Sequence, residues 1–323
     1  MSSPARSHTT SRVFRSDVVL EPGFDVVTGA FSYTGRFIAR KLLDHGRRVR
    51  TLTNHPQRPG AQEIEVDVAP LKFSERAALV DAFRGADVLY NTYWVRFHHG
   101  GIGFGDAIAN TRILMSAAAE AGVRKVVHIS VSNPSLDSHL DYYAGKARTE
   151  EIVRESGMQW AVVRPTLIFG SGDILINNIA WLLRYIPFFV IPEMGRYRVQ
   201  PVAGEDVADI ATWAAGQAEN VVVDAAGPEI ISYAELVHSV ATALRRRARI
   251  VSMPAGVTLA MGGVVGLLVR DVVLTRQELQ GLMQELLVSR EEPRGARRVD
   301  DWLLRSAGSL GRSYASELSR HFR

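Results

Sequence analysis

The chain has 323 residues, 46% of them hydrophobic, which is enough to bury a full core in one large domain or in two. Its net charge of +4 comes from basic residues spread along the whole chain, so the charge pattern argues against a nucleic-acid partner. The absence of cysteine excludes disulfides, thiolate metal sites and a cysteine nucleophile.

Two stretches of the sequence indicate where in the cell the protein is located. The first residues are rich in Ser, Thr and Arg but lack the apolar core of a secretory signal, so we expect residues 1–22 to be a disordered tail. The most apolar run, residues 255–269, is shorter than the roughly 20 residues that cross a bilayer. We therefore expect a cytoplasmic protein in which this run forms a buried or interfacial helix, with peripheral membrane contact as the alternative.

Short apolar runs alternate with helical patterns from residue 24 onward. The expected strands are 24–28, 48–53, 63–66, 88–92, 126–130, 160–164 and 221–224. The expected helices between them are 35–45, 74–84, 104–121 and 140–156. A repeated strand-helix unit predicts an α/β fold with a doubly wound parallel Rossmann sheet.

The same pattern divides the chain in two. We expect a Rossmann domain over 23–170 plus 201–227, and a smaller, mostly helical substrate lobe over 171–200 plus 228–323. In the lobe, Ser232 with Glu235 and Thr275 with Glu278 have the spacing of capping boxes, which predicts a helix start at each pair.

The segment TGAFSYTGR follows the first expected strand and opens the first helix. Gly29, Ser32 and Gly35 stand at the spacing of a dinucleotide-binding turn, with serine in the middle position. Glycines permit a tight backbone beside a pyrophosphate, and a helix N-terminus favours its negative charge. The predicted phosphate-binding residues are Thr28, Gly29, Ser32, Tyr33, Thr34, Gly35 and Arg36.

The end of the second expected strand lacks the acidic residue that would bind the ribose hydroxyls of NAD. Asn54, His55 and Arg58 follow instead, and together with Arg36 they favour NADP(H) over NAD(H). Asp67 and Val68 follow the third expected strand, where they would contact the adenine; a strand-end cap is the alternative for Asp67.

Tyr142 and Lys146 lie four residues apart on an expected helix and therefore on the same face. A phenol becomes an effective acid-base near neutral pH when a cation favours its anion, and Lys146 would supply that charge. Tyr142 would exchange a proton with a carbonyl or alcohol oxygen while hydride moves to or from the nicotinamide. Ser130 or Ser132, at the end of the preceding strand, would orient that oxygen.

These motifs, with HISVS before the pair and VRPTLIFG after it, resemble the short-chain dehydrogenase/reductase superfamily in its extended or atypical branch. The chain is similar to NmrA-like proteins and to the reductase-like accessory subunit of respiratory complex I, whose segments resemble GRYRVQPVAGEDVADIA. The resemblance implies Pro165 near the nicotinamide, Thr92 near the ribose or pyrophosphate, and 171–200 around the substrate. Homodimers are frequent in this family.

The chain departs from the family pattern at several positions. Ser32 replaces a glycine, and bulky Tyr93 and Trp94 stand where small residues are usual. We expect the apolar stretch 174–192 to be lobe core, with a pocket for a hydrophobic substrate as the alternative. His98 and His99 have no adjacent carboxylate ligand, so no metal site is predicted.

The sequence thus predicts an NAD(P)(H)-dependent oxidoreductase, or an epimerase or dehydratase, acting on a small carbonyl or alcohol substrate. The alternative is a protein that senses NADP(H) or serves as a scaffold without turnover. The intact Tyr142 and Lys146 pair favours the enzyme.

Overall fold

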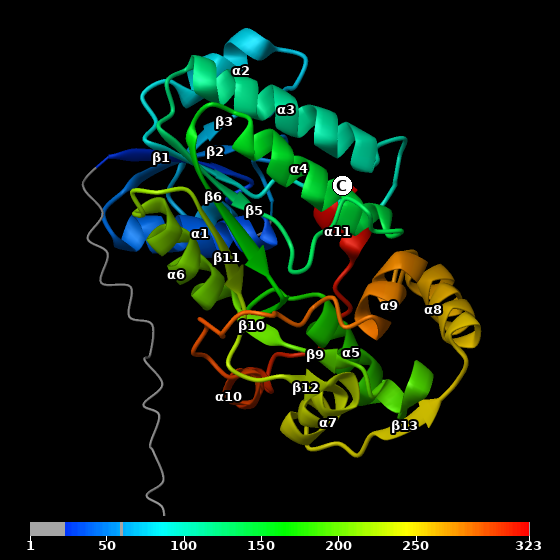
Figure 1. Ribbon diagram of the computed structural model, residues 1–323. Helices are drawn as coiled ribbons and strands as arrows, with labels where there is room; N and C mark the ends of the chain where they lie inside the picture. The colour runs from blue at the N-terminus through cyan, green and yellow to red at the C-terminus, as the bar shows by residue number, and fades with distance from the viewer. Residues whose placement is uncertain (1–22, 59–60, 323) are drawn as a thin grey trace, which may run out of the picture.

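The computed structural model describes residues 23–58 and 61–322, so the predicted tail over residues 1–22 lies outside the described part. Seven parallel strands form the central sheet in the order β11-β6-β5-β4-β1-β2-β3 (Figure 1). The strands are β1 (Phe24–Thr28), β2 (Arg48–Leu52), β3 (Asp67–Ala69), β4 (Val88–Asn91), β5 (Lys125–Ile129), β6 (Gln159–Pro165) and β11 (Val221–Ala225). The predicted doubly wound parallel sheet is confirmed.

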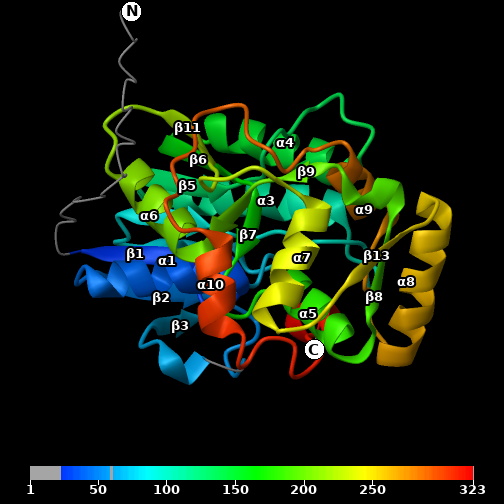
Figure 2. The ribbon, with the colours of Figure 1, turned by 90° about the horizontal axis from the view of Figure 1, so that it is seen from below.

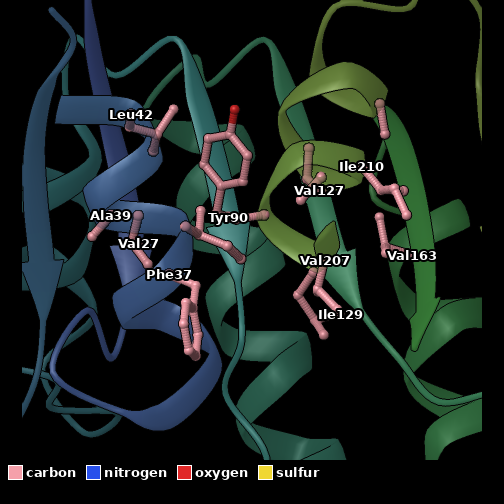
Figure 3. Packing of buried hydrophobic residues seen from close by; sticks show 14 of the residues in the cluster. Val27, Phe37, Ala39, Leu42, Tyr90, Val127, Ile129, Val163, Val207 and Ile210 are labelled. Carbon is pink, nitrogen blue, oxygen red and sulfur yellow. The ribbon is translucent and has the colours of Figure 1, made fainter. Parts of the chain in front are cut away.

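Helices cover both faces of this sheet. One face carries α1 (Tyr33–Asp44) and α6 (Gly204–Ala215), and the other carries α2 (Arg76–Phe83), α3 (Phe104–Glu120) and α4 (Asp141–Arg154) (Figure 1). Figure 3 shows Phe37 and Leu42 of α1, Val127 of β5 and Val207 of α6 in one buried cluster. A second cluster, with Leu79, Leu89 and Leu114, fills the opposite face. Burial on both faces explains why the strands read as apolar runs.

The third strand is the one element that the sequence pattern misplaced. Residues 63–66 are not a strand; a 3-10 helix (η1, Ala61–Glu63) precedes β3, which begins at Asp67. β3 pairs with β2 from Arg50 and Asp67 to Leu52 and Ala69. The alternating apolar residues before residue 67 have the pattern of a strand. The strand nevertheless begins at Asp67, because that is where the chain hydrogen-bonds to β2. The register between two strands cannot be predicted from the local sequence.

The remaining elements form a second, smaller part of the fold, here called the second body, beside the carboxyl edge of the sheet (Figure 2). Its short strand pairs are β7 (Leu167–Phe169) with β10 (Pro201–Ala203), β9 (Arg198–Val199) with β12 (Ile231–Ser232), and β8 (Phe188–Ile191) with β13 (Arg249–Ser252). Its helical elements are α5 (Leu175–Tyr185), η2 (Pro192–Gly195), α7 (Tyr233–Ala243), α8 (Ala255–Val269), α9 (Arg276–Met283), α10 (Val299–Ser306) and α11 (Glu317–Phe322).

This second body has its own buried cluster, which includes Ile176, Leu236 and Leu303 from α5, α7 and α10. Both predicted capping boxes are present, at Ser232 for α7 and Thr275 for α9. No helix within residues 23–58 and 61–322 is long and apolar enough to cross a membrane. We propose that the two bodies are separated near the boundaries expected from the sequence, with the β7 and β10 pair, which the expected Rossmann ranges include, at the junction.

Candidate active site

The turn between β1 and α1 is shaped by its two glycines. Gly29 has a φ of +71°, which favours glycine, and a Cβ on Gly35 would lie 2.2 Å from the Gly29 carbonyl oxygen. Ser32 occupies the N-cap position of α1 without a capping hydrogen bond from its side chain, and its hydroxyl lies inside the turn. Partly buried Thr34 is the second residue of the helix. The first turn of α1 thus directs backbone N–H groups, which lack helical partners, toward the carboxyl edge of the sheet.

A hydrogen-bond network joins the carboxyl ends of β1 and β4. The Thr28 hydroxyl donates to Asn91 Oδ1 at 3.1 Å and accepts from the Thr92 backbone N–H at 2.8 Å. The Thr92 hydroxyl donates to the Thr28 carbonyl oxygen. The strand order reverses between β1 and β4, which is where open α/β sheets bind ligands. The network therefore holds this crevice in a fixed shape.

Three predicted cofactor residues have structural partners elsewhere. Asn54 bonds the backbone of Leu71 twice, joining the loops that follow β2 and β3. Asp67 begins β3 instead of following it, and its carboxylate lies 3.8 Å from Arg50. Val68 is exposed in mid-strand, paired with Thr51. The structure corrects the position expected for Asp67 and Val68, because both lie within β3 and not after it; their contact with the adenine stays a prediction.

Three arginines from distant parts of the chain, Arg36, Arg58 and Arg320, act on one another near the start of α1. Arg36 Nη2 donates to the Ser171 carbonyl oxygen at 3.0 Å, and Arg320 Nη2, from α11, donates to the Gly172 carbonyl oxygen at 2.6 Å. The Arg320 guanidinium also lies 5.7 Å from the centre of the Tyr33 ring. Arg320 was not predicted from the sequence, because no recognisable motif surrounds it.

Burial and mutual repulsion lower the pKa values of these arginines. Burial is the main cause for each; Arg320 also lowers the pKa of Arg58, and Arg36 lowers that of Arg320. The buried Nε atoms of Arg36 and Arg58 and the buried Tyr33 hydroxyl have no hydrogen-bond partner within the described residues. In that same part of the chain, none of the three arginines has a carboxylate oxygen within 4.0 Å. This arrangement suits an anion.

Tyr142 lies in the first turn of α4, packed edge-on against Trp94 and Phe104 with ring centres 5.9 and 6.0 Å away. Burial raises the pKa of Tyr142 to about 12; Arg96 acts to lower it and Glu278 to raise it. At neutral pH the phenol is therefore protonated. Within the described residues its hydroxyl has no hydrogen-bond partner, so it is available to a ligand.

Lys146 lies one turn further along α4 and is fully enclosed. Its ammonium donates to the Ile129 carbonyl oxygen at 3.0 Å and lies 4.8 Å from the centre of the Trp94 ring. Burial lowers the pKa of Lys146 to about 7, which the charge of Glu150 partly opposes. Lys146 and Tyr142 thus both contact Trp94, whereas the charges that act on the phenol come from Arg96 and Glu278. The sequence analysis did not identify Arg96 as a charge that acts on the Tyr142 phenol.

The two candidate serines point in different directions. The Ser130 hydroxyl donates to the buried carboxylate of Glu150 at 2.6 Å. The Ser132 hydroxyl donates to the Leu286 carbonyl oxygen at 2.7 Å, and its backbone N–H donates to the carbonyl oxygen of buried Pro165. Neither serine is hydrogen-bonded to Tyr142.

Helix α9 connects this site to the second body. The Arg96 guanidinium contacts Glu278 of α9 at 2.5 Å and the buried Glu317 of α11. Gln277 accepts the Tyr142 backbone N–H at 3.2 Å. The surroundings of the phenol therefore depend on segments more than 130 residues further along the chain.

Two other sequence features have clear positions. The stretch 174–192 contributes Ile176, Ile179 and Leu183 to the buried cluster of the second body, as expected for core. The His98 ring packs against Phe104 at a tilt, with ring centres 4.7 Å apart, and with His99 it belongs to a loop that lines an open depression. The residues that the structure describes contain no group of three or more His, Asp or Glu that could hold a metal ion.

The chain is similar in sequence to several known proteins. Residues 29–171 match the model of a family described as NAD(P)H-binding. A Streptomyces griseus (4-alkanoyl-5-oxo-2,5-dihydrofuran-3-yl)methyl phosphate reductase is 28% identical, over 69% of this chain and 75% of its own. The 40 kDa subunit of Neurospora crassa NADH-ubiquinone oxidoreductase is 23% identical, over 82% of this chain and 72% of its own.

The fold has close structural neighbours. The NADPH-dependent quinone oxidoreductase QOR2 of Escherichia coli, solved with NADPH, has a TM-score of 0.68 at 17% identity, over 88% of this chain and 99% of that one. The chain spans only 19% of the length of the first curated relatives it matches, uncharacterized mycobacterial proteins that are 29% identical. The parallel sheet with its glycine turn defines a nicotinamide-dinucleotide-binding protein. Over residues 29–171, less than half of its length, the chain is similar to a family described as NAD(P)H-binding, and its fold resembles that of a solved short-chain dehydrogenase/reductase superfamily protein, with a TM-score of 0.64 at 18% identity.

Proposed function

We propose that the chain is an NADP(H)-dependent reductase of a carbonyl substrate, with Tyr142 as the proton donor. One observation carries the proposal. The glycine turn at the start of α1 and the unpartnered phenol at the start of α4 lie at the same carboxyl edge of a parallel sheet. The edge includes the crevice where the strand order reverses, so a dinucleotide in the turn and a substrate at the phenol would meet there.

The residues fit a dinucleotide. Gly35 leaves room for close backbone approach, and the first turn of α1 offers N–H groups to a pyrophosphate. The buried Nε atoms of Arg36 and Arg58, without partners in the described part of the chain, supply donors for a further phosphate group. That surplus of positive charge supports NADP(H) over NAD(H), although NAD(H) would meet the same turn.

The chemistry follows from the protonation states. When bound, the cofactor supplies the hydride that a carbonyl carbon accepts. The Tyr142 hydroxyl gives its proton to the carbonyl oxygen, which completes the alcohol. Because the pKa of Tyr142 is raised to about 12, the phenol holds this proton at neutral pH, which suits reduction better than alcohol oxidation. Arg96 favours the tyrosinate that remains, whereas Lys146 is not among the charges that act on the phenol in this structure.

The surroundings of the Tyr142 hydroxyl, where the substrate would bind, are apolar and include one further hydrogen-bond donor. Trp94 and Phe104 stack with ring centres 5.7 Å apart beside Tyr142, and the buried Trp94 Nε1 has no partner within the described residues. These rings favour a substrate with an apolar body and a polar carbonyl. The names of the Streptomyces griseus and Escherichia coli relatives, a reductase and a quinone oxidoreductase, support a reduction. Epimerase or dehydratase chemistry remains the alternative within the superfamily.

Calorimetric titration with NADPH and NADH, followed by assays of NADPH oxidation on aldehydes, ketones and quinones, tests the proposal. Tyr142→Phe should keep NADPH affinity within about twofold and lose at least about a hundredfold in turnover, the usual contribution of general acid catalysis. Tyr143→Phe is the matched control, because Tyr143 is the next residue and packs against Val131 and Leu140. Equal turnover in Tyr142→Phe and wild type would disprove the role of Tyr142.

A second candidate, an NADP(H)-binding protein without turnover, is favoured by one observation. Trp94 contacts both Tyr142 and Lys146, and thereby takes up space beside the candidate pair. NADPH binding without oxidation by any carbonyl in the panel, in the wild type and also in Trp94→Ala, would favour this candidate over the reductase.

A further inference from the structure

Helix α8, residues Ala255–Val269, has no charged side chain and exposes five of its large apolar residues, while Leu259, Val265 and Val269 are half-buried. Leu267 and Leu268 are 80% and 79% exposed, Val264 59%, Val257 43% and Met261 40%. Val257, Met261, Val264 and Leu268 recur at intervals of four and three residues, so they form one stripe along the helix. A continuous apolar stripe therefore faces away from the protein.

The opposite side of α8 packs through small residues. Thr258 and Gly266 are the buried residues of this helix, and a Cβ on Gly266 would lie 2.7 Å from the Asp271 carbonyl oxygen. The usual arrangement of a surface helix is reversed, because large apolar side chains normally face the core and polar ones the solvent. A helix whose buried positions are small and whose Leu267 and Leu268 are exposed presents an apolar surface that a membrane or a partner can cover.

Neighbouring elements enlarge the apolar surface. Phe188 of β8 and Tyr185 at the end of α5 are exposed, as is Met253 just before α8. β8 pairs with β13, which leads directly into α8. Figure 2 shows α8, β8 and β13 together at one side of the molecule. We name the residues Tyr185, Phe188, Met253, Val257, Met261, Val264, Leu267 and Leu268 the α8 face.

Positive charge flanks the α8 face. Arg245, Arg246, Arg247 and Arg249 precede and begin β13, and Arg270 ends α8; all five are exposed. Within residues 23–58 and 61–322, none of them has a carboxylate oxygen within 4.0 Å. An apolar surface bordered by unpaired arginines matches an anionic bilayer, whose headgroups attract arginine while its acyl region accepts leucine.

We propose that the protein docks on anionic membranes through the α8 face, with α8 lying in the plane of the interface. Fifteen residues of helix extend about 22 Å, less than the roughly 30 Å of a hydrocarbon core, so the helix would lie on the bilayer and not cross it. A second copy is the other occupant to consider. Docking two copies through this face would bring two arginine runs together, and that repulsion favours the membrane.

Flotation of the full chain with vesicles tests the proposal, using phosphatidylcholine alone and phosphatidylcholine with phosphatidylserine. Wild type should float with the anionic vesicles at low salt and stay in solution with the neutral ones. The double variant Leu267→Gln with Leu268→Gln, and separately Arg246→Gln with Arg247→Gln, should each lower the vesicle partition coefficient roughly tenfold or more. Leu304→Gln and Arg305→Gln, exposed positions on α10, are the matched controls.

Three outcomes would overturn the proposal. The first is that wild type is not recovered with anionic vesicles, and the second is that the α10 controls reduce flotation as much as the α8 variants. The third is a dimer, detected by light scattering without vesicles, that the Leu267 and Leu268 variant dissociates; it would assign the α8 face to a second copy. The measurement does not depend on cofactor or turnover, so its failure leaves the reductase proposal untouched.

Discussion

The ammonium of Lys146 lies 4.8 Å from the centre of the Trp94 ring, enclosed between α4 and the carboxyl end of β4. This contact holds the lysine in surroundings where its charge is poorly solvated. A ring face partly compensates through cation–π attraction, but the pKa still falls to about 7. The site therefore contains a cation that titrates near neutral pH.

The first prediction concerns stability and pH. An unfolded lysine keeps its proton up to a pKa near 10.4, whereas the folded Lys146 loses it near 7. Between these values the unfolded state binds more protons, so stability rises with pH. The free energy of unfolding of wild type, relative to Lys146→Met, should increase from about pH 7 to about pH 10, by at most about 1.4 kcal/mol per pH unit. Urea denaturation at a series of pH values measures it.

Lys72 provides the control for this experiment, because it is exposed and pairs with Glu75 on the surface. Lys72→Met should show no such pH-dependent difference from wild type. A flat difference for Lys146→Met over the same range would show that Lys146 stays charged in the folded protein.

The second prediction tests the phosphate site. Arg58→Gln should weaken NADPH binding roughly tenfold or more, because a charge-assisted bond to phosphate is lost, and should change NADH binding by less than about twofold. Titration calorimetry with both dinucleotides measures the difference. Arg84→Gln is the control, since Arg84 is exposed and pairs with Asp81 on α2. An equal loss for NADH and NADPH would assign Arg58 to the pyrophosphate instead.

The third prediction concerns the glycine turn. Gly35→Ala should abolish measurable dinucleotide binding and lower the melting temperature, because the added Cβ would lie 2.2 Å from the Gly29 carbonyl oxygen and must displace the turn. Gly105→Ala, where nothing lies within 4 Å of the added Cβ in α3, should leave binding unchanged and the stability equal or higher. Dinucleotide binding that survives Gly35→Ala would place the cofactor elsewhere.

The fourth prediction separates the two serines. Ser130→Ala removes a hydrogen bond to the buried Glu150 and should lower the free energy of unfolding by about 1–2 kcal/mol while turnover persists. Ser132→Ala should instead lower turnover, because Ser132 lies at the boundary with the second body, bonded to Leu286. Denaturation and NADPH oxidation, measured on both variants, check it. The reverse pattern would make Ser130 the residue that orients the substrate.

Several features could be read from the sequence because they depend on near neighbours. The glycine spacing from Gly29 to Gly35, the capping box at Ser232 and the apolar runs of the strands each involve residues a few positions apart. The position of Tyr142 and Lys146 on one helix follows from helical periodicity alone. These local signals predicted the parallel sheet and the resemblance to NAD(P)H-binding proteins.

Other features depend on contacts between distant elements. The start of β3 at Asp67 depends on its register with β2, and the charges that act on Tyr142 come from Arg96 and from Glu278 in α9. Arg320 reaches the start of α1 only because α11 folds back against it. Hence the sequence by itself determined the sheet, the glycine turn and the helical pair, since each is fixed by short-range periodicity. Only the tertiary structure decided which charges surround them, because packing brings together residues that no local pattern connects.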